Sequence, residues 1–386
     1  MRPRSTTIAK YACHATLAVS LLGGSTGCAS SGLGRARSRF YGGDFENAAQ
    51  TLEERPIRSR DQVLVLMERG AAWQAAGAHD HAIRDWLEAA DIINALDYIR
   101  LSEKATSLIV NDATQTYSGW PYERALLHAF TAKSFFALGQ WRSAAVEARL
   151  IADGLENLNG FPDDPYTRYV AATAFEAIRD FNGSRIEFTK ANEITPHIWI
   201  DPTTGIITPG TNAPPEHAPP DRELICFIGI GRAPVFTMRS SAQNLRWGTN
   251  PYVEVYNRGN LLGRSYTLKT TAALAAETER RIAAIQAAKT VTRIVIKESI
   301  ASAVEENNVL LGGLLRILLF ATEIPDTRSW QTLPNWLQVA RVPLPENTTE
   351  IELRFKTSSG ATLRSMIIPH DLLHTDGKYY FSARAW

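Results

Sequence analysis

The sequence predicts an α+β protein in which an all-α array of helix hairpins precedes a small antiparallel β-sandwich-like domain with a long inserted helix. Three observations predict it: small and aromatic residues recur at fixed spacings in the first half, prolines gather near residue 210, and short alternating apolar runs fill the end. A chain of 386 residues is long for a single core. We therefore expect two domains after a leader segment.

Residues 1–28 have the pattern of a lipoprotein signal peptide. Basic residues precede the apolar stretch 11–22, which is too short for a stable membrane span, and small residues then lead to Cys28. This resembles the site at which bacterial lipoproteins are acylated and cut, although Ser25 stands where an aliphatic residue is usual. Because Ala29 rather than an aspartate follows, the resemblance implies a lipid anchor in the outer membrane, facing the periplasm. The alternative is an ordinary leader and a soluble periplasmic protein.

The segment 29–200 repeats the small-large-small spacing of the tetratricopeptide repeat, a helix hairpin of about 34 residues. Small residues let paired helices approach, aromatic residues fill the space between hairpins, and a glycine permits the turn. Arg179 replaces that glycine in the third copy. The positions assigned to repeat packing are Gly70, Trp73, Gly77, Ala82, Trp86 and Ala89, then Ala132, Phe135, Gly139 and Ala144, then Ala172, Phe175, Ser184, Phe188, Ala191 and Pro196, with Ala36, Gly43, Ala48 and Leu52 as a capping half-copy. The alternative is an irregular helical bundle with the same aromatic core.

A proline-rich linker at 201–222 separates this array from a C-terminal domain at 223–386. In that domain, alternating apolar residues between turn signals predict strands. The expected strands are 223–230, 252–256, 336–342, 350–356, 362–368 and 378–383.

A helical insertion is expected at about 270–321. Apolar residues at near-helical spacing predict one long helix from about residue 270 to 307. The most apolar run follows at 309–320, but it contains Arg316 and is shorter than a bilayer span requires. We expect a buried helix there; the alternative is a helix that contacts a membrane or a partner.

The C-terminal half also carries a set of short motifs. It resembles an uncharacterised family of bacterial tetratricopeptide lipoproteins, and the similarity takes in 229–234 and 123–149 as well. This resemblance implies an architecture and a location in the cell envelope, but no reaction. The motifs that carry it are Asp326-Thr327-Arg328-Ser329-Trp330, Leu333-Pro334 and Val339-Ala340-Arg341-Val342-Pro343-Leu344-Pro345.

No pattern in the sequence predicts catalysis, a cofactor or a metal ion. The 41 basic and 40 acidic residues nearly cancel, which disfavours nucleic acid as a partner. Cys226 lies in an apolar run and is expected to be a buried, inert thiol, and Gly231 is expected in a tight turn because Pro234 replaces the start of a phosphate-binding helix. His370 and His374 are four residues apart, but they follow a proline and lack a convincing third ligand, so a solvated loop is expected.

Asp326, Arg328 and Trp330 are the candidate recognition residues, because a carboxylate, a guanidinium and an indole together suit partner binding. In the alternative, Asp326 and Arg328 pair to fix the loop and Trp330 fills the β domain. The sequence as a whole favours a membrane-anchored interaction or scaffold protein whose partners are other envelope proteins. Two alternatives stay open: an accessory subunit of a cell-wall synthesis or export assembly, and a hydrolase with an unrecognised site.

Overall fold

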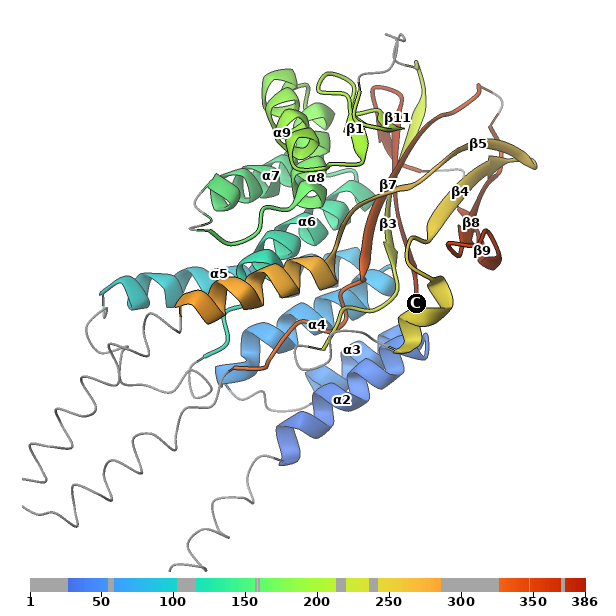
Figure 1. Ribbon diagram of the computed structural model, residues 1–386. Helices are drawn as coiled ribbons and strands as arrows, with labels where there is room; N and C mark the ends of the chain where they lie inside the picture. Colours follow the sequence, from blue (N-terminus) through green and yellow to red (C-terminus); the bar gives the residue numbers. More distant parts are fainter. Residues whose placement is uncertain are drawn as a thin grey trace, which may run out of the picture.

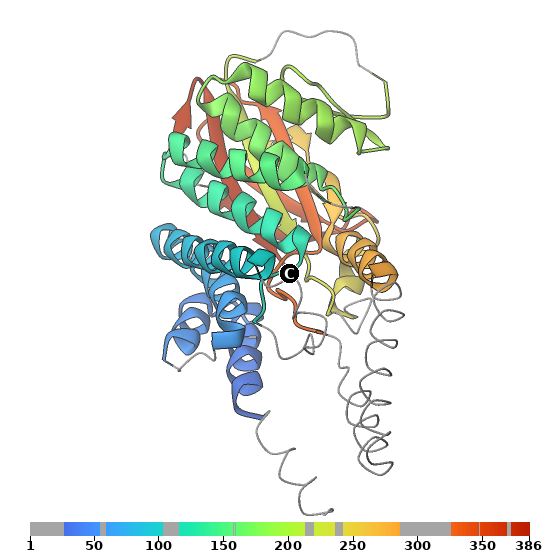
Figure 2. The same ribbon diagram turned by 90° about the vertical axis from the view of Figure 1, so that its left-hand side faces the viewer.

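The computed structural model describes residues 27–54, 59–102, 116–156, 158, 160–212, 220–235, 242–285, 326–346, 348–368 and 372–386. The chain is α+β, as predicted, with the helices before the main sheets. Helix pairs form one layer, and the sheets lie along one side of it (Figure 1). Turned by 90°, the helical layer lies in front of the strands (Figure 2).

Consecutive helices pack against each other in pairs. The pairs are α2 (Gly27–Tyr41) with α3 (Phe45–Glu53), α4 (Gln62–Ala75) with α5 (His79–Ser102), α6 (Pro121–Ala137) with α7 (Trp141–Glu156), and α8 (Pro165–Ala177) with α9 (Phe181–Glu193); η1 (Ser59–Asp61) precedes α4. Gly77 and Gly139 have positive φ in two of the turns, a conformation that glycine adopts at little cost. Arg179, in the third predicted copy, adopts φ 63° at the equivalent point without a glycine.

The residues assigned to repeat packing are largely buried in these pairs. Ala82, Ala132, Ala144 and Phe188 are fully enclosed. Gly70 is the tightest point, because a Cβ atom there would lie 2.4 Å from Nε1 of Trp86. Absence of a side chain at Gly70 therefore lets the Trp86 indole lie directly against α4.

The five-stranded sheet lies next to the helices and has the order β10-β11-β3-β7-β6. Its strands are β10 (His374–Thr375), β11 (Lys378–Ala385), β3 (Glu223–Ile230), β7 (Trp336–Pro343) and β6 (Tyr266–Thr270). β11 runs parallel to β3, so this sheet is mixed and the predicted all-antiparallel arrangement is wrong for that pair. Only strands joined by a short hairpin are forced to run antiparallel, and β3 and β11 are far apart in the chain.

The four-stranded sheet is antiparallel and has the order β5-β4-β8-β9. Its strands are β4 (Tyr252–Asn257), β5 (Asn260–Arg264), β8 (Ile351–Lys356) and β9 (Thr362–Ile368). A short η3 helix (Ala242–Trp247) precedes β4. The predicted alternation in β8 is confirmed, since Ile351, Leu353 and Phe355 are buried and the residues between them are less so.

β3 is buried on both faces, which explains its almost continuous apolar sequence. Ile225 and Phe227 join a cluster that contains residues of the helices, whereas Leu224 and Cys226 join a second cluster that contains residues of both sheets. One hydrophobic core therefore joins the helices to the five-stranded sheet, and another joins the two sheets.

A buried ionic network also joins α8 to the sheet. Arg341 of β7, only 1% exposed, lies 2.9 Å from Glu176 of α8 and 2.5 Å from Glu223 of β3. Lys378 adds a 2.8 Å contact to Glu223. Because each buried charge has an opposite partner, this network fixes how the helices lie on the sheet.

Several predicted boundaries differ from the structure. Part of the predicted linker forms a hairpin with the end of the array, in which β2 (Ile207–Pro209) pairs with β1 (Ile198–Ile200). Of the predicted long helix, residues 271–285 are helical, and the apolar run 309–320 lies outside the described residues. None of the described helices has the length and apolar character needed to span a bilayer.

Candidate functional site

Asp326 and Arg328 are brought together, and both face the helical array. Nε and Nη2 of Arg328 donate to the Asp326 carboxylate at 2.9 and 2.7 Å. Nη1 of Arg328 donates to the Asp61 carboxylate at 2.8 Å and to the carbonyl of Arg60 at 3.0 Å. The guanidinium is thus used to attach the segment 326–333 to the start of α4.

Trp330 lies among the helices and not between the two sheets. Its ring is 1% exposed, with centroids 6.2 Å from Trp86 of α5 and 5.7 Å from Phe130 of α6. Its indole nitrogen donates to Thr332 at 2.9 Å, so the buried polar atom is satisfied. Trp330 therefore anchors the segment 326–333 in the helical core.

Two buried carboxylates of the array hold the main chain of this segment. Glu123 of α6 accepts from the Trp330 amide at 2.8 Å, and Glu68 of α4 accepts from the Gln331 amide at 3.0 Å. The carbonyls are bound as well, because the Trp120 indole donates to the Arg328 carbonyl and the Tyr41 hydroxyl donates to the Gln331 carbonyl. The helices thus bind a loop segment of the same chain through its backbone.

Glu123 is fully buried, and the burial raises its pKa to about 7. Hydrogen bonds to the carboxylate oppose this shift. They come from the Tyr117 hydroxyl, the Trp330 and Trp120 amides, and the Tyr122 hydroxyl. Because all of these groups donate, the ionised carboxylate is the form that fits the geometry.

The second helices of the pairs carry exposed apolar side chains. On α7, Val146 is 50% and Leu150 43% exposed; on α9, Phe181 is 64% and Ile186 51% exposed. Both helices pack against α8, and one ion pair, Lys190 of α9 with Glu156 at 3.4 Å, joins α9 to the end of α7. We name Val146, Leu150, Phe181 and Ile186 the α7–α9 face.

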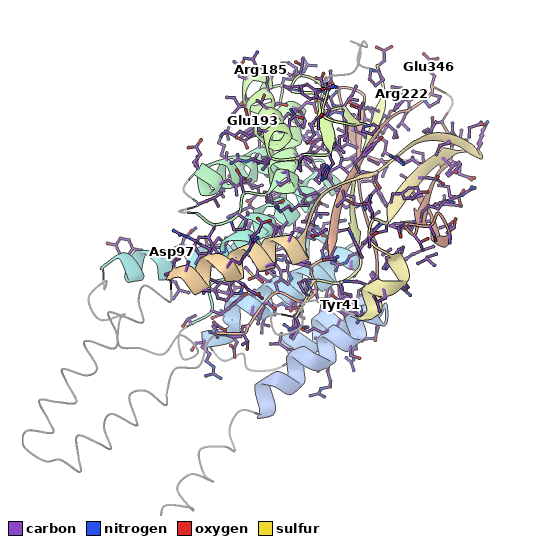
Figure 3. All side chains as sticks on the ribbon, in the orientation of Figure 1. Tyr41, Asp97, Arg185, Glu193, Arg222 and Glu346 are labelled. Carbon is purple, nitrogen blue, oxygen red and sulfur yellow. The ribbon has the colours of Figure 1, made fainter. Side chains whose placement is uncertain are left out.

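The α7–α9 face also carries basic residues and lies away from the sheets. Arg142, Arg149 and Arg185 are exposed on the same two helices. Figure 3 shows Arg185 and Glu193 projecting from α9 at the edge of the molecule. By contrast, α8 is buried along its whole length, because the sheet covers one side and its neighbouring helices cover the other. Exposed aromatic, aliphatic and arginine side chains together are typical of interface centres.

The described residues contain no group of three or more histidine, cysteine, aspartate or glutamate side chains that could hold a metal ion. His374 lies in β10, where its ring packs on Tyr379 with centroids 4.6 Å apart, while His370 is outside the described residues. Cys226 is fully buried, and this burial raises the pKa of its thiol. Gly231 has φ 74° at the bend that follows β3, as expected for a turn.

Sequence reasoning missed the carboxylates that hold the segment 326–333. Glu68 follows the apolar run 63–67, and Glu123 follows Pro121 at the start of a predicted helix, where an acidic residue commonly favours the helix dipole. Nothing in those patterns indicates a distant main-chain partner. Cys28 is the second residue of α2, and the lipidation predicted for it stays a prediction.

The chain was compared with protein-family models, with curated protein sequences and with solved structures, and no significant match was found in any of the three.

Proposed function

We propose that this protein is a lipid-anchored module of the bacterial cell envelope that binds another envelope protein through the α7–α9 face. The anchor would be Cys28, which becomes the first residue after removal of residues 1–27. In this proposal the helix pairs are tetratricopeptide-type repeats and the two sheets form a sandwich-like unit that supports them.

One observation supports the proposal above the others: the exposed apolar residues of the array lie on the second helices, while the first helices are covered. On α6 and α8 most residues are buried between the second helices and the sheet. The surface left for a partner is therefore the outer one. Val146, Leu150, Phe181 and Ile186 are each more than 40% exposed, although apolar side chains of β5 and β9 are exposed to a similar degree, and a partner would cover those on the helices.

The binding chemistry of the array supports the same reading. Its inner side already holds the segment 326–333 by carboxylate-to-amide hydrogen bonds and a buried tryptophan. Helical arrays commonly bind extended peptides in this way. Since the inner side is occupied by the chain itself, Asp326, Arg328 and Trp330 serve the internal contact, and recognition of a partner falls to the outer helices.

The test is affinity capture of the membrane-anchored protein with the double substitution Leu150→Glu and Ile186→Glu. We expect loss of a specific partner, because two carboxylates would be placed in an apolar contact. Leu261→Glu, at a 56% exposed leucine on β5, is the matched control and should retain the partner. Recovery of the same partner by the double variant would contradict the proposed face.

The anchor is tested separately by Cys28→Ala and mass spectrometry of the mature amino terminus. We expect an acylated cysteine in the unmodified protein and a soluble, unacylated form in the variant. An unacylated terminus in the unmodified protein would remove the anchor from the proposal without affecting the α7–α9 face.

A further inference from the structure

A cavity lies between the helical layer and the five-stranded sheet, and the contacts described above do not use it. It has two adjoining parts of about 250 and 270 Å³, which share His79, Lys133, Phe381 and Ser382 in their walls. Helices α4 and α6 contribute one side and strand β11 the other. Its walls are mainly apolar, with Phe130 and Trp386 among the aromatic residues of the larger part.

Lys133 of α6 places a buried amine in the wall of both parts. Lys133 is only 6% exposed. None of the ion pairs among the described residues includes its amine. Nζ donates to the Tyr166 hydroxyl at 3.3 Å and lies 3.3 Å from the centroid of the Phe130 ring. These contacts partly stabilise the Lys133 amine, but they leave it able to donate a further hydrogen bond into the cavity.

Arg384 of β11 is a second cation in the wall of the larger part. Its Nε and Nη2 atoms are buried and have no hydrogen-bond partner in the described structure. The guanidinium lies 4.9 Å from the centroid of the Phe40 ring. Buried guanidinium nitrogens without acceptors are costly, so an acceptor is expected to be supplied when the site is filled.

The neighbouring charges do not cancel these two cations. Glu68 attracts Arg384, but its contacts with Arg37 at 2.6 Å and with the Gln331 amide both use Oε1, and among the described residues its buried Oε2 has no hydrogen-bond partner. Arg232 adds further positive charge near Arg384. Burial holds the pKa of Lys133 well below its usual range, and the charge of Arg384 lowers it further. The negative charge of an anion in the cavity would stabilise the protonated amine and so oppose this lowering of the pKa.

We propose that this cavity binds a small organic carboxylate, whose acidic group lies between Lys133 and Arg384 and whose apolar body lies against the aromatic wall. Arginine pairs with a carboxylate through two parallel N–H donors, and lysine adds a point charge. A mainly apolar cavity with a few placed polar groups is the usual form of a small-molecule site.

A carboxylate suits the site better than a free phosphate. Phosphate sites are usually built from several backbone amides at a glycine-rich loop or a helix start, whereas the donors here are basic side chains: buried Lys133 and Arg384, with exposed Arg364 of β9 at the wall of the larger part. The polar side chains at the opposite edge are already engaged with one another, since Gln74 donates to Ser134 at 2.9 Å and His79 lies 3.3 Å from the same hydroxyl. The remainder of the wall offers surface for an aromatic or aliphatic body.

The test is a calorimetric titration of the purified chain with sodium benzoate at constant ionic strength. We expect saturable binding of benzoate, weaker by about tenfold or more in Lys133→Met, because one charge-assisted contact is lost. Methionine keeps the length and apolar stem of the lysine, so the core should remain packed. Lys190→Met, at a lysine on the outer helix α9, is the matched control and should bind benzoate as the unmodified protein does.

Two further probes separate the possible sources of binding. Benzyl alcohol has the same ring without the charge and should bind much more weakly, whereas equal binding would show an apolar cavity that does not use the cations. Inorganic phosphate should not compete. Arg384→Met provides a second variant in case Lys133→Met unfolds. The proposal would be overturned if the unmodified protein did not bind benzoate, or if phosphate displaced benzoate. It would also be overturned if Lys133→Met and Arg384→Met both bound benzoate as tightly as the unmodified protein does.

Discussion

At the scale of single residues, the packing of the helical array depends on how closely the Trp86 ring of α5 approaches α4 at Gly70. Its position leaves room for Trp86, whose indole nitrogen also donates to the Met67 carbonyl at 3.2 Å. A side chain at position 70 would occupy the volume of that ring. Both the packing and the hydrogen bond of Trp86 therefore require the missing Cβ.

Gly70→Ala should destabilise the protein by about 1–3 kcal/mol, because the added methyl group overpacks the contact with Trp86. This outweighs the gain of up to about 1 kcal/mol that alanine gives inside a helix. Gly154→Ala in α7 is the control, since nothing lies within 4 Å of its Cβ position and stability should rise slightly. Urea unfolding measures both variants. Equal stability changes in the two would show that the Gly70 contact is not tight.

Glu123 should make stability depend on pH. Its pKa rises from 4.5 to about 7 on folding, so the folded state binds the proton more tightly than the unfolded state does. The resulting stabilisation is full below about pH 4.5 and is lost as pH rises through about 7, by roughly 3 kcal/mol in total. Denaturation between pH 4.5 and 7.5 should show this slope in the unmodified protein and a smaller slope in Glu123→Gln, where buried Asp164, with its pKa raised to about 6, still contributes. Parallel profiles would contradict the assignment.

The sequence predicted the structural roles of some of these residues and not of others. Gly70 and Trp86 belong to a spacing that repeats, so their roles could be inferred without a structure. Lys133 and Glu123 could not be inferred, because a charged residue in a helix is normally on its solvated face. Which face is solvated depends on where the sheet packs, and that information is not local to the helix.

At the scale of elements, the segment 326–333 connects the helical and β parts. Its main chain binds to the helices, and at its last residue the Leu333 carbonyl accepts from the Ala233 amide at 2.8 Å. It is continuous with β7 and so aligns the central strands with α4 and α6. This element was predicted as a recognition loop, and its internal role depends on contacts across more than 200 positions of the chain.

Trp330→Ala should cost about 3–5 kcal/mol, since a buried aromatic ring between Trp86 and Phe130 would be replaced by a cavity. Hydrogen exchange followed by mass spectrometry should show faster exchange in the segment 326–333 and at the start of α6. Trp199→Ala, at a partly exposed tryptophan on β1, is the control and should cost less. A cost no larger than that of the control would show that Trp330 does not anchor the segment.

The sequence predicted where the strands begin and end better than it predicted the direction in which they pair. The boundaries of β3 and β9 agree with those predicted, because alternation and turn residues determine them locally. The parallel pairing of β11 with β3 arises from a connection between strands distant in the chain, which no local pattern records.

At the scale of the whole molecule, three layers follow one another: the helices, the five-stranded sheet and the four-stranded sheet (Figure 1). Apart from the cavity beside Lys133, the shared core and the Arg341 network fill the contact between the array and the sheet. Recognition by this protein is therefore expected at the outer helices, where apolar side chains are exposed.

Site-specific photo-crosslinking in intact cells tests this claim most directly. A photoreactive phenylalanine analogue would replace Leu150 or Ile186 on the α7–α9 face, and Leu261 on β5 as the control; all three leucine or isoleucine side chains are more than 40% exposed. The account predicts one discrete crosslinked product from positions 150 and 186, and none from position 261. No product from the helical positions, or the same product from all three, would contradict it.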